Sequence, residues 1–253
     1  MILNAFNLEG KIALVTGCNT GLGQGMALAL AEAGCDIIGV NRAGSEETQT
    51  RIQALGRRFF PFQADLTDAT RAAQIVTQAV AAAGKIDILV NNAGIIRRED
   101  ALNFSEKDWD DVMNINSKTL FFLSQQVARQ FIAQGQGGKI INIASMLSFQ
   151  GGIRVPSYTA SKSAVMGLTR LMANEWAQYG INVNAIAPGY MATNNTGQLR
   201  NDEARNEAIL ERIPAGRWGT PDDMKGPIVF LASPAADYVN GYTLAVDGGW
   251  LAR

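Results

Sequence analysis

The most constraining feature of this chain is a glycine-bearing turn that joins an apolar segment to a run of small residues. Lys11–Thr16 (KIALVT) predicts a buried strand, and Gln24–Ala33 predicts a helix that stops at Gly34. Glycines let a backbone approach a pyrophosphate, and a helix N-terminus offers free N–H groups. We therefore predict the opening of a dinucleotide-binding unit, although the spacing Thr-Gly-x-x-x-Gly-x-Gly differs from Gly-x-Gly-x-x-Gly. The candidate cofactor-binding residues in this turn are Gly17, Asn19, Thr20, Gly21, Leu22 and Gly23.

Strands and helices are predicted to alternate along the whole chain. Apolar runs predict further strands at 36–41, 59–63, 86–90, 140–144, 181–187 and 242–246. Helices are predicted at 46–55, 69–83, 109–131, around Tyr158 to Lys162, at 202–212 and at 221–231. This order predicts one domain over residues 1–253, an α/β Rossmann-type doubly wound sheet of about seven parallel strands with helices on both faces. Polar residues at about 190–215 predict a substrate lid.

Several polar residues follow the ends of the predicted strands, where parallel sheets bind nucleotides. After the second strand the chain has Asn41 and Arg42 at a place where an acidic residue would bind the ribose hydroxyls. The asparagine can still hydrogen-bond those hydroxyls, whereas the arginine could accept a 2′-phosphate, so these two residues leave NAD and NADP open. The other candidates in this crevice are Asp65, Leu66, Asn92, Ala93 and Gly94.

A serine, a tyrosine and a lysine form a candidate reaction centre. Ser145 follows the apolar run at 140–144, and Tyr158 and Lys162 share one face of a predicted helix. A free tyrosine titrates near ~10, and a lysine cation nearby favours the phenolate. The set suits proton exchange with an alcohol or a ketone. Taken without a cofactor site, the pair is better explained as an exposed helical Tyr and Lys, as any soluble protein can carry.

The composition excludes several other classes of protein. The net charge is −1, so no basic field points to nucleic acid, and no apolar run is long enough to span a membrane. The chain contains no histidine and only Cys18 and Cys35, which excludes Ser–His–Asp hydrolysis, a disulfide framework and a zinc cluster. The start lacks the features of a signal peptide. We expect a cytoplasmic enzyme that binds no metal.

Taken together, these motifs resemble the short-chain dehydrogenase/reductase family from end to end. The motifs are Thr16-Gly17-x-x-x-Gly21-x-Gly23, Asp65, Asn91-Asn92-Ala93-Gly94, Asn116, Ser145, Tyr158-x-x-x-Lys162, and Pro188-Gly189 with Thr193. The resemblance implies that Tyr158 is the acid/base and that Ser145 holds the reacting oxygen. It implies that Lys162 binds the nicotinamide ribose and lowers the tyrosine pKa, and that Asn116 anchors a water of the proton relay. Asp65 and Leu66 would flank the adenine, and Pro188, Gly189, Met191 and Thr193 would fix the carboxamide.

Within the family, the chain is similar in detail to dehydrogenases of deoxy sugar acids. The segments that carry this likeness are 96–101, 145–156, 187–196, 212–219 and 246–253. The likeness implies hydride transfer at C5 of a sugar acid in pectin and hexuronate breakdown, a homotetramer, and NAD as cofactor with NADP possible. The glycine turn has no basic residue for a 2′-phosphate, which favours NAD. The candidate substrate-binding residues are Ser145, Gln150, Arg154 and Tyr158.

Recognition of a sugar-acid carboxylate would need a cation remote from Tyr158. Arg154 is the first candidate, Arg97 and Arg98 are the second, and Arg217 is the third. A local ion pair is the competing explanation for Arg154.

Two other functions remain open from the sequence. A 3-oxoacyl carrier protein reductase that uses NADPH shares the same catalytic set, but it would need a basic surface for its acidic carrier. A non-catalytic nucleotide-binding scaffold would be expected to lose part of the Ser–Tyr–Lys set, which this chain retains.

Overall fold

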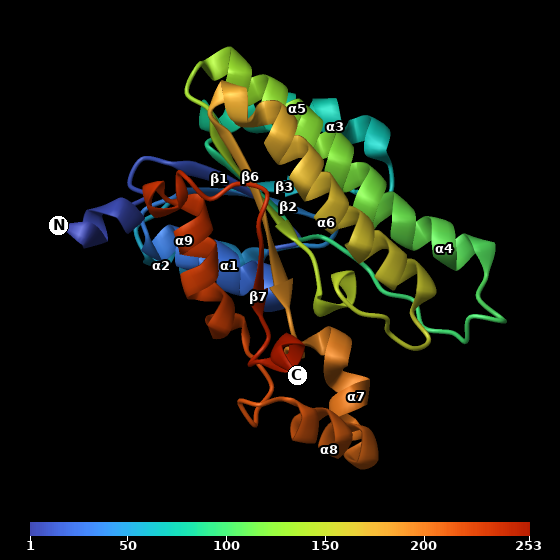
Figure 1. The fold of residues 1–253 in the computed structure, drawn as a ribbon. Coiled ribbons are helices and arrows are strands. Elements are labelled where there is room, and N and C mark those ends of the chain that lie inside the picture. Colours follow the sequence, from blue (N-terminus) through green and yellow to red (C-terminus); the bar gives the residue numbers. More distant parts are fainter.

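Seven parallel strands form one sheet in the computed structural model, which describes residues 1–253 (Figure 1). Their order across the sheet is β3-β2-β1-β4-β5-β6-β7, and every neighbouring pair is parallel. This arrangement confirms the predicted doubly wound α/β fold. The strands are β1 (Ile12–Thr16), β2 (Asp36–Asn41), β3 (Phe59–Gln63), β4 (Ile88–Asn91), β5 (Gly138–Ile143), β6 (Ile181–Pro188) and β7 (Thr243–Val246).

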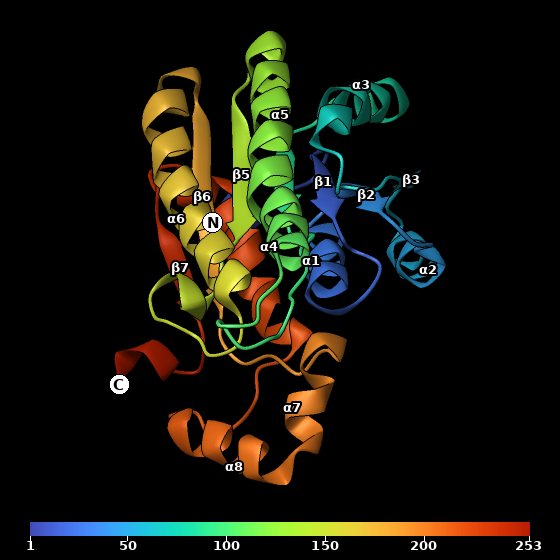
Figure 2. The same ribbon diagram turned by 90° about the vertical axis from the view of Figure 1, so that its right-hand side faces the viewer.

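Helices cover both faces of the sheet, as Figures 1 and 2 show. One face carries α1 (Gly21–Glu32), α2 (Glu46–Ala54) and α9 (Lys225–Ala232). The opposite face carries α3 (Ala72–Ala83), α4 (Glu106–Met113), α5 (Leu120–Gln134) and α6 (Pro156–Trp176). Each face buries a cluster of 25 core residues, so the central strands are apolar on both sides. None of the helices is long and apolar enough to cross a bilayer.

The strand order reverses beside β1, because β2 and β3 lie on one side of it and β4 to β7 lie on the other. A doubly wound sheet opens a crevice at this point, at the carboxyl ends of its strands. Beyond that edge lie α7 (Gly197–Asn201) and α8 (Glu203–Arg212), apart from the layers that cover the sheet (Figure 2). These two helices fall within the segment that was predicted to form a lid.

Two helices begin three residues before their predicted starts. Helix α1 begins at Gly21 and not at residue 24, because the last glycines of the turn form its first helical turn. The helix predicted at 109–131 begins at Glu106, where the Ser105 hydroxyl accepts a hydrogen bond from the Asp108 amide at 3.1 Å. It is also interrupted by a π-helical turn over Asn114–Thr119 before α5 continues it.

Short 3-10 helices complete the chain. They are Ile2–Phe6, Ala69–Arg71, Met146–Ser148, Ala177–Tyr179, Asn194–Thr196, Pro221–Met224, Pro234–Ala236 and Trp250–Ala252. Two of them, Ala69–Arg71 and Pro221–Met224, run directly into α3 and α9 and so begin the helices predicted there.

Candidate active site

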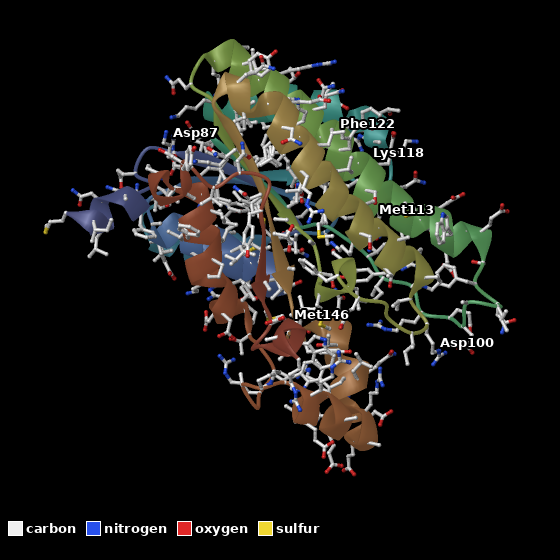
Figure 3. All side chains as sticks on the ribbon, in the orientation of Figure 1. Asp87, Asp100, Met113, Lys118, Phe122 and Met146 are labelled. Atoms are coloured by element: carbon white, nitrogen blue, oxygen red, sulfur yellow. The ribbon has the colours of Figure 1, made fainter.

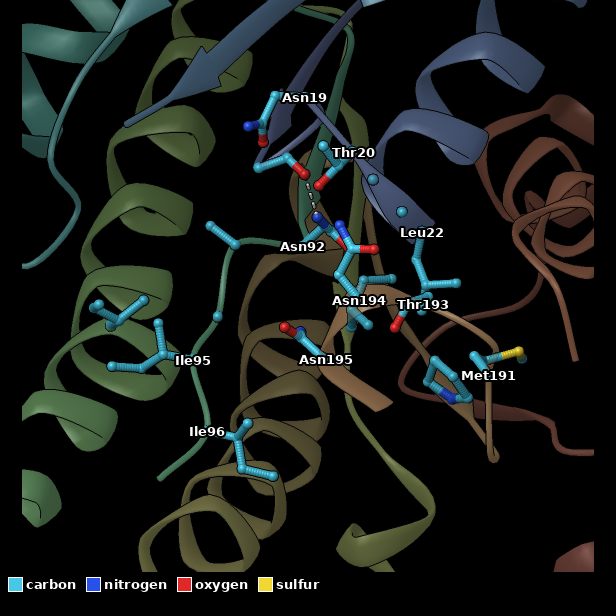
Figure 4. A pocket seen from close by; sticks show the side chains of 18 of the residues that line it. Asn19, Thr20, Leu22, Asn92, Ile95, Ile96, Met191, Thr193, Asn194 and Asn195 are labelled. Atoms are coloured by element: carbon cyan, nitrogen blue, oxygen red, sulfur yellow. Dashed lines mark hydrogen bonds between the residues drawn. The ribbon is translucent and has the colours of Figure 1, made fainter. Parts of the chain in front are cut away.

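A cleft with a volume of about 580 Å³ lies at the carboxyl edge of the sheet (Figure 4). It brings together all the residues predicted to bind a cofactor. They are Gly17, Asn19, Thr20, Gly21, Leu22, Gly23, Asn41, Arg42, Asp65, Leu66, Asn92, Ala93, Gly94, Tyr158, Lys162, Pro188, Gly189, Met191 and Thr193. Ser145 lines the same cleft, whereas Asn116, Gln150 and Arg154 do not.

The conformation and packing of the turn require glycine at three positions. Gly17 and Gly21 have φ angles of +64° and +58°, which are strained for other residues. A Cβ on Gly23 would lie 2.1 Å from the Gly17 carbonyl oxygen, so glycine is required there. The backbone N–H groups of Asn19 and Thr20 donate to no protein atom. Free donors beside a helix N-terminus form an anion site, so the turn fits a pyrophosphate.

Asn92 joins this turn to the end of β4. Its amide nitrogen donates to the carbonyl oxygens of Thr16 and Gly17 at 3.0 and 2.8 Å, and Figure 4 marks one hydrogen bond of Asn92 with a dashed line. The Thr16 hydroxyl in turn accepts hydrogen bonds from the backbone N–H groups of Asn92 and Ala93. The side chain of Asn92 therefore holds the wall of the cleft in shape.

Asn41 and Arg42, at the end of β2, differ in whether their side chains are free to bind a ribose or its phosphate. The Asn41 side chain is buried, and its amide oxygen accepts a hydrogen bond from the Cys18 amide at 2.7 Å. Arg42 lines the cleft, is exposed, and forms no ion pair. Hydrogen bonds from Thr67 keep the pKa of the nearby Asp65 carboxyl below its ordinary value. The unpaired guanidinium is thus available to an anion at this end of the cleft.

The three proposed catalytic side chains meet at the opposite end of the cleft. Ser145 comes two residues after β5, and its hydroxyl accepts a hydrogen bond from the Leu147 amide at 3.2 Å. Pro156 begins α6, which carries Tyr158 and Lys162 on one face. The ammonium of Lys162 lies 5.6 Å from the centroid of the Tyr158 ring. The expected i, i+4 geometry is therefore present.

Burial controls the protonation of this pair. Desolvation raises the pKa of Tyr158, and a hydrogen bond with Ser145 and the charge of Arg98 only partly offset this effect. Desolvation also lowers the pKa of Lys162 to about 8, while its ammonium donates to the Ile143 carbonyl. The net direction for Tyr158 is opposite to the one that we expected from Lys162. At neutral pH the phenol is protonated, which suits proton donation to a ketone oxygen.

Asn116 lies on the π-helical turn and is 1% exposed. Its amide oxygen accepts a hydrogen bond from the Ile95 amide at 2.9 Å, and its amide nitrogen donates to the Ile95 carbonyl at 3.0 Å. The same nitrogen donates to the Ser161 hydroxyl at 3.1 Å. Asn116 thus joins the segment after Gly94 to α6, and its role in a proton relay stays a prediction.

The arginines considered for the substrate carboxylate differ in their partners. Arg154 is exposed, has a φ angle of 62°, and pairs with Asp100 at 3.4 Å, outside the cleft. Arg98 lines the cleft, has no carboxylate partner, and donates to the Asn195 carbonyl at 3.2 Å. The geometry therefore favours Arg98 over our first candidate.

The remaining candidates are also engaged elsewhere. Arg97 lies 3.2 Å from Asp108. Arg217 forms two hydrogen bonds with Asp223 at 2.8 and 2.7 Å. Gln150 accepts a hydrogen bond from Arg212 at 3.2 Å and lies outside the cleft. Sequence reasoning did not include several cleft-lining residues, namely Ile95, Ile96, Ile115, Asn194 and Asn195, because no motif marks them.

Comparison with known proteins decides the family. The sequence pattern of the family described as short chain dehydrogenase matches residues 11–204. The chain belongs to the short-chain dehydrogenase family. It is therefore an oxidoreductase of the alcohol dehydrogenase and ketoreductase type, as predicted.

This short-chain dehydrogenase has relatives that match it over its whole length. It is 73% identical to 2-dehydro-3-deoxy-D-gluconate 5-dehydrogenase of Dickeya dadantii (strain 3937) over 253 residues, which cover 100% of both chains. The enzyme of the same name from Escherichia coli (strain K12) is also 73% identical over 253 residues, again with 100% coverage of both chains. A crystal structure from Agrobacterium tumefaciens, described as a 2-deoxy-D-gluconate 3-dehydrogenase with bound NADP, is similar at a TM-score of 0.95. It is 58% identical, with 99% of this chain and 100% of that chain covered.

Proposed function

We propose that this enzyme interconverts 2-dehydro-3-deoxy-D-gluconate and 3-deoxy-D-glycero-2,5-hexodiulosonate, with NAD(H) as cofactor, in the breakdown of pectin and hexuronates. The observation that carries the proposal is one cleft that joins the glycine turn to Ser145, Tyr158 and Lys162 and presents the unpaired Arg98 beside them. The relatives at 73% identity over the whole chain support the choice of substrate.

The side chains of the cleft divide the chemistry between them. A bound nicotinamide would supply the hydride acceptor or donor for C5 of the sugar acid. Tyr158 gives its phenolic proton to the ketone oxygen in reduction and takes a proton from the alcohol in oxidation. The Ser145 hydroxyl donates to the same oxygen and orients it. Lys162 would bind the ribose of the nicotinamide, and the free N–H groups of the glycine turn would hold the pyrophosphate.

Arg98 is the residue that we propose for the substrate carboxylate. A linear hexonate carries its charge several carbons from C5, and Arg98 lies close enough to Tyr158 to act on the pKa of its phenol. An arginine fork can bind a carboxylate through two parallel hydrogen bonds. The other arginine of the cleft, Arg42, lies at the β2 end, where the adenosine ribose would bind.

The test compares Arg98→Ala with the matched control Arg154→Ala, on 2-dehydro-3-deoxy-D-gluconate and on an uncharged ketone. We expect Arg98→Ala to raise KM for the sugar acid by roughly 10- to 100-fold, because a hydrogen bond to a charged group contributes about 1.5–3 kcal/mol. KM for the uncharged ketone and cofactor affinity should change little, and Arg154→Ala should resemble the wild type. The reverse pattern would return the carboxylate to Arg154, and absence of sugar-acid turnover in the wild type would refute the proposed substrate.

Arg42 bears on whether the enzyme uses NAD(H) or NADP(H). The base-free glycine turn supports NAD(H), while the unpaired Arg42 can bind the 2′-phosphate of NADP(H), so we propose that NADP(H) is also accepted. Arg42→Ala should lower kcat/KM for NADP(H) about tenfold and leave the value for NAD(H) unchanged, which corresponds to about 1.4 kcal/mol. Equal losses with both cofactors would show that Arg42 does not read the 2′-phosphate.

The other functions left open by the sequence have less support. A reductase of carrier-bound acyl groups has no counterpart among the full-length relatives at 73% identity, which are sugar-acid dehydrogenases. A non-catalytic scaffold does not explain why Ser145, Tyr158 and Lys162 line the cleft together. We further propose that the enzyme is a cytoplasmic homotetramer, and exposed apolar side chains such as Trp109, Phe122 and Leu171 support an assembly.

A further inference from the structure

Thr48 is a polar residue of α2 that is 0% exposed, although the helix around it is mostly polar and faces solvent. Its hydroxyl donates to the Cys18 carbonyl at 2.9 Å and lies 3.5 Å from the Asn19 carbonyl. It accepts a hydrogen bond from the side-chain amide of Gln24 at 3.0 Å. Both carbonyl groups belong to the glycine turn, so α2 contacts the turn from outside the cleft.

These contacts determine which way the turn presents its donors. A trans peptide is planar, so its C=O and the next N–H point in opposite directions. Carbonyl groups of Cys18 and Asn19 that point toward α2 therefore direct the N–H groups of Asn19 and Thr20 to the other side. The side chains of both residues line the cleft there, and neither N–H group has a protein partner.

Two further side chains complete the support. The side-chain amide of Gln24 donates to the Asn19 carbonyl at 3.4 Å as well as to Thr48, and Arg51 donates to the side-chain amide oxygen of Gln24 at 3.2 Å. On the β2 side, Asn41 accepts a hydrogen bond from the Cys18 amide at 2.7 Å. The peptide groups around Cys18 are thus held on both sides by side chains that do not belong to the turn.

We propose that Thr48 is a positioning residue for the cofactor, which holds the glycine turn in the shape that binds the pyrophosphate. This inference rests on the proposed function only in assuming that the cleft binds a dinucleotide. Thr48 has no place in the cleft itself, so its effect on binding acts through the turn. The effect should be the same for NADH and NADPH, because both contain the pyrophosphate.

The test measures dissociation constants by calorimetry for NADH, NADPH, ADP-ribose and adenosine. Thr48→Val keeps the shape of the side chain and removes the hydroxyl, Thr48→Ser keeps the hydroxyl, and Thr50→Val is a control on the same helix. Thr50 is exposed and its hydroxyl bonds only to the Glu46 carbonyl. We expect Thr48→Val to raise Kd for the three pyrophosphate ligands by roughly five- to tenfold. Adenosine binding and kcat at saturating cofactor should stay unchanged, and Thr48→Ser and Thr50→Val should bind like the wild type.

Several results would overturn the proposal. A folded Thr48→Val protein with unchanged Kd values would do so, and so would an equal loss of adenosine affinity or a loss that Thr48→Ser shares. If Thr48→Val does not fold, Gln24→Leu removes the neighbouring donor and should weaken the same three ligands in the same proportion. Unchanged binding in that variant would also refute the proposal. Because these measurements use no sugar acid, a wrong substrate assignment would leave their outcome unaffected.

Discussion

Tyr158 and Lys162 are four residues apart on α6. The side chain of Lys162 is almost fully buried, since the residue is only 5% exposed. Desolvation acts on them in opposite directions, raising the pKa of the phenol and lowering that of the ammonium. Both shifts favour the neutral form of each side chain. Burial therefore keeps the phenolic proton on Tyr158 at neutral pH, which suits proton donation to a ketone oxygen.

Removal of the phenolic hydroxyl tests the acid/base assignment. Tyr158→Phe should lower kcat by ~10²–10⁴-fold, because it deletes the proton carrier and leaves the packing of the ring unchanged. The Kd for NADH, measured by fluorescence titration, should stay close to that of the wild type. Turnover above a tenth of the wild-type rate would contradict the assignment.

The buried ammonium of Lys162 gives a prediction about pH. Its pKa falls from 10.5 to about 8 on folding, so the folded protein binds fewer protons than the unfolded chain between these two values. The contribution of Lys162 to the free energy of unfolding therefore rises as pH increases through this window and is lost again as pH falls to 8.

Lys162→Met lacks this titration. The stability of the variant relative to the wild type should decrease by about 2 kcal/mol when the pH is raised from about 7 to about 9.5. Urea denaturation of both proteins at the two pH values, without added cofactor, measures the difference in their free energies of unfolding at each pH. A relative stability that does not depend on pH would mean that Lys162 titrates normally.

At the scale of elements, the segment 190–215 is anchored on the C-terminal end of the chain. Trp250 is 5% exposed, and its ring lies 4.8 Å from that of Tyr190 and 4.1 Å from the guanidinium of Arg212. Met146, next to Ser145, belongs to the same cluster and is labelled in Figure 3. The cluster thus connects α8 with the turn that follows Ser145.

Loss of the Trp250 ring should loosen α8. Trp250→Ala should speed limited proteolysis within residues 197–212 and raise KM for the sugar acid, because a buried aromatic ring contributes about 3–5 kcal/mol. Trp250→Phe is the matched control, since the indole N–H has no hydrogen-bond partner and the ring face is retained. Cleavage spread evenly over the chain would instead indicate global destabilisation.

At the scale of the whole molecule, apolar side chains remain exposed on the helices that cover one face of the sheet. Trp109 of α4 is 40% exposed, Phe122 of α5 is 38% exposed and points outward in Figure 3, and Leu171 of α6 is 45% exposed. An apolar surface of this kind is typical of an interaction site.

The proposed tetramer predicts a specific mass. Light scattering should give about 108 kDa, four times the 27.1 kDa of one chain. Leu171→Glu replaces an exposed apolar side chain of α6 with a charge and should shift the mass toward smaller species. A wild-type mass of one chain would refute the tetramer, and an unchanged mass for the variant would place the interface elsewhere.

The amino-acid sequence by itself determined the fold class and the cofactor cleft. The periodicity of apolar residues and the placement of glycines are local features that can be recognised directly in the sequence. For this reason all seven strands were predicted to within two or three residues of their observed ends. The carboxyl ends of parallel strands share one edge, which is why residues as distant in sequence as Gly17, Asn92 and Thr193 were correctly predicted to line one cleft.

Only the tertiary structure decided which charges are free and which polar groups are buried. Arg154 pairs with Asp100 and Arg217 pairs with Asp223, so Arg98 is left without a carboxylate partner in the cleft. The burial of Thr48 likewise results from packing of α2 against the glycine turn. The physical reason is that ion pairing and desolvation depend on residues from other segments of the chain, whereas helical and strand periodicity depend on adjacent ones.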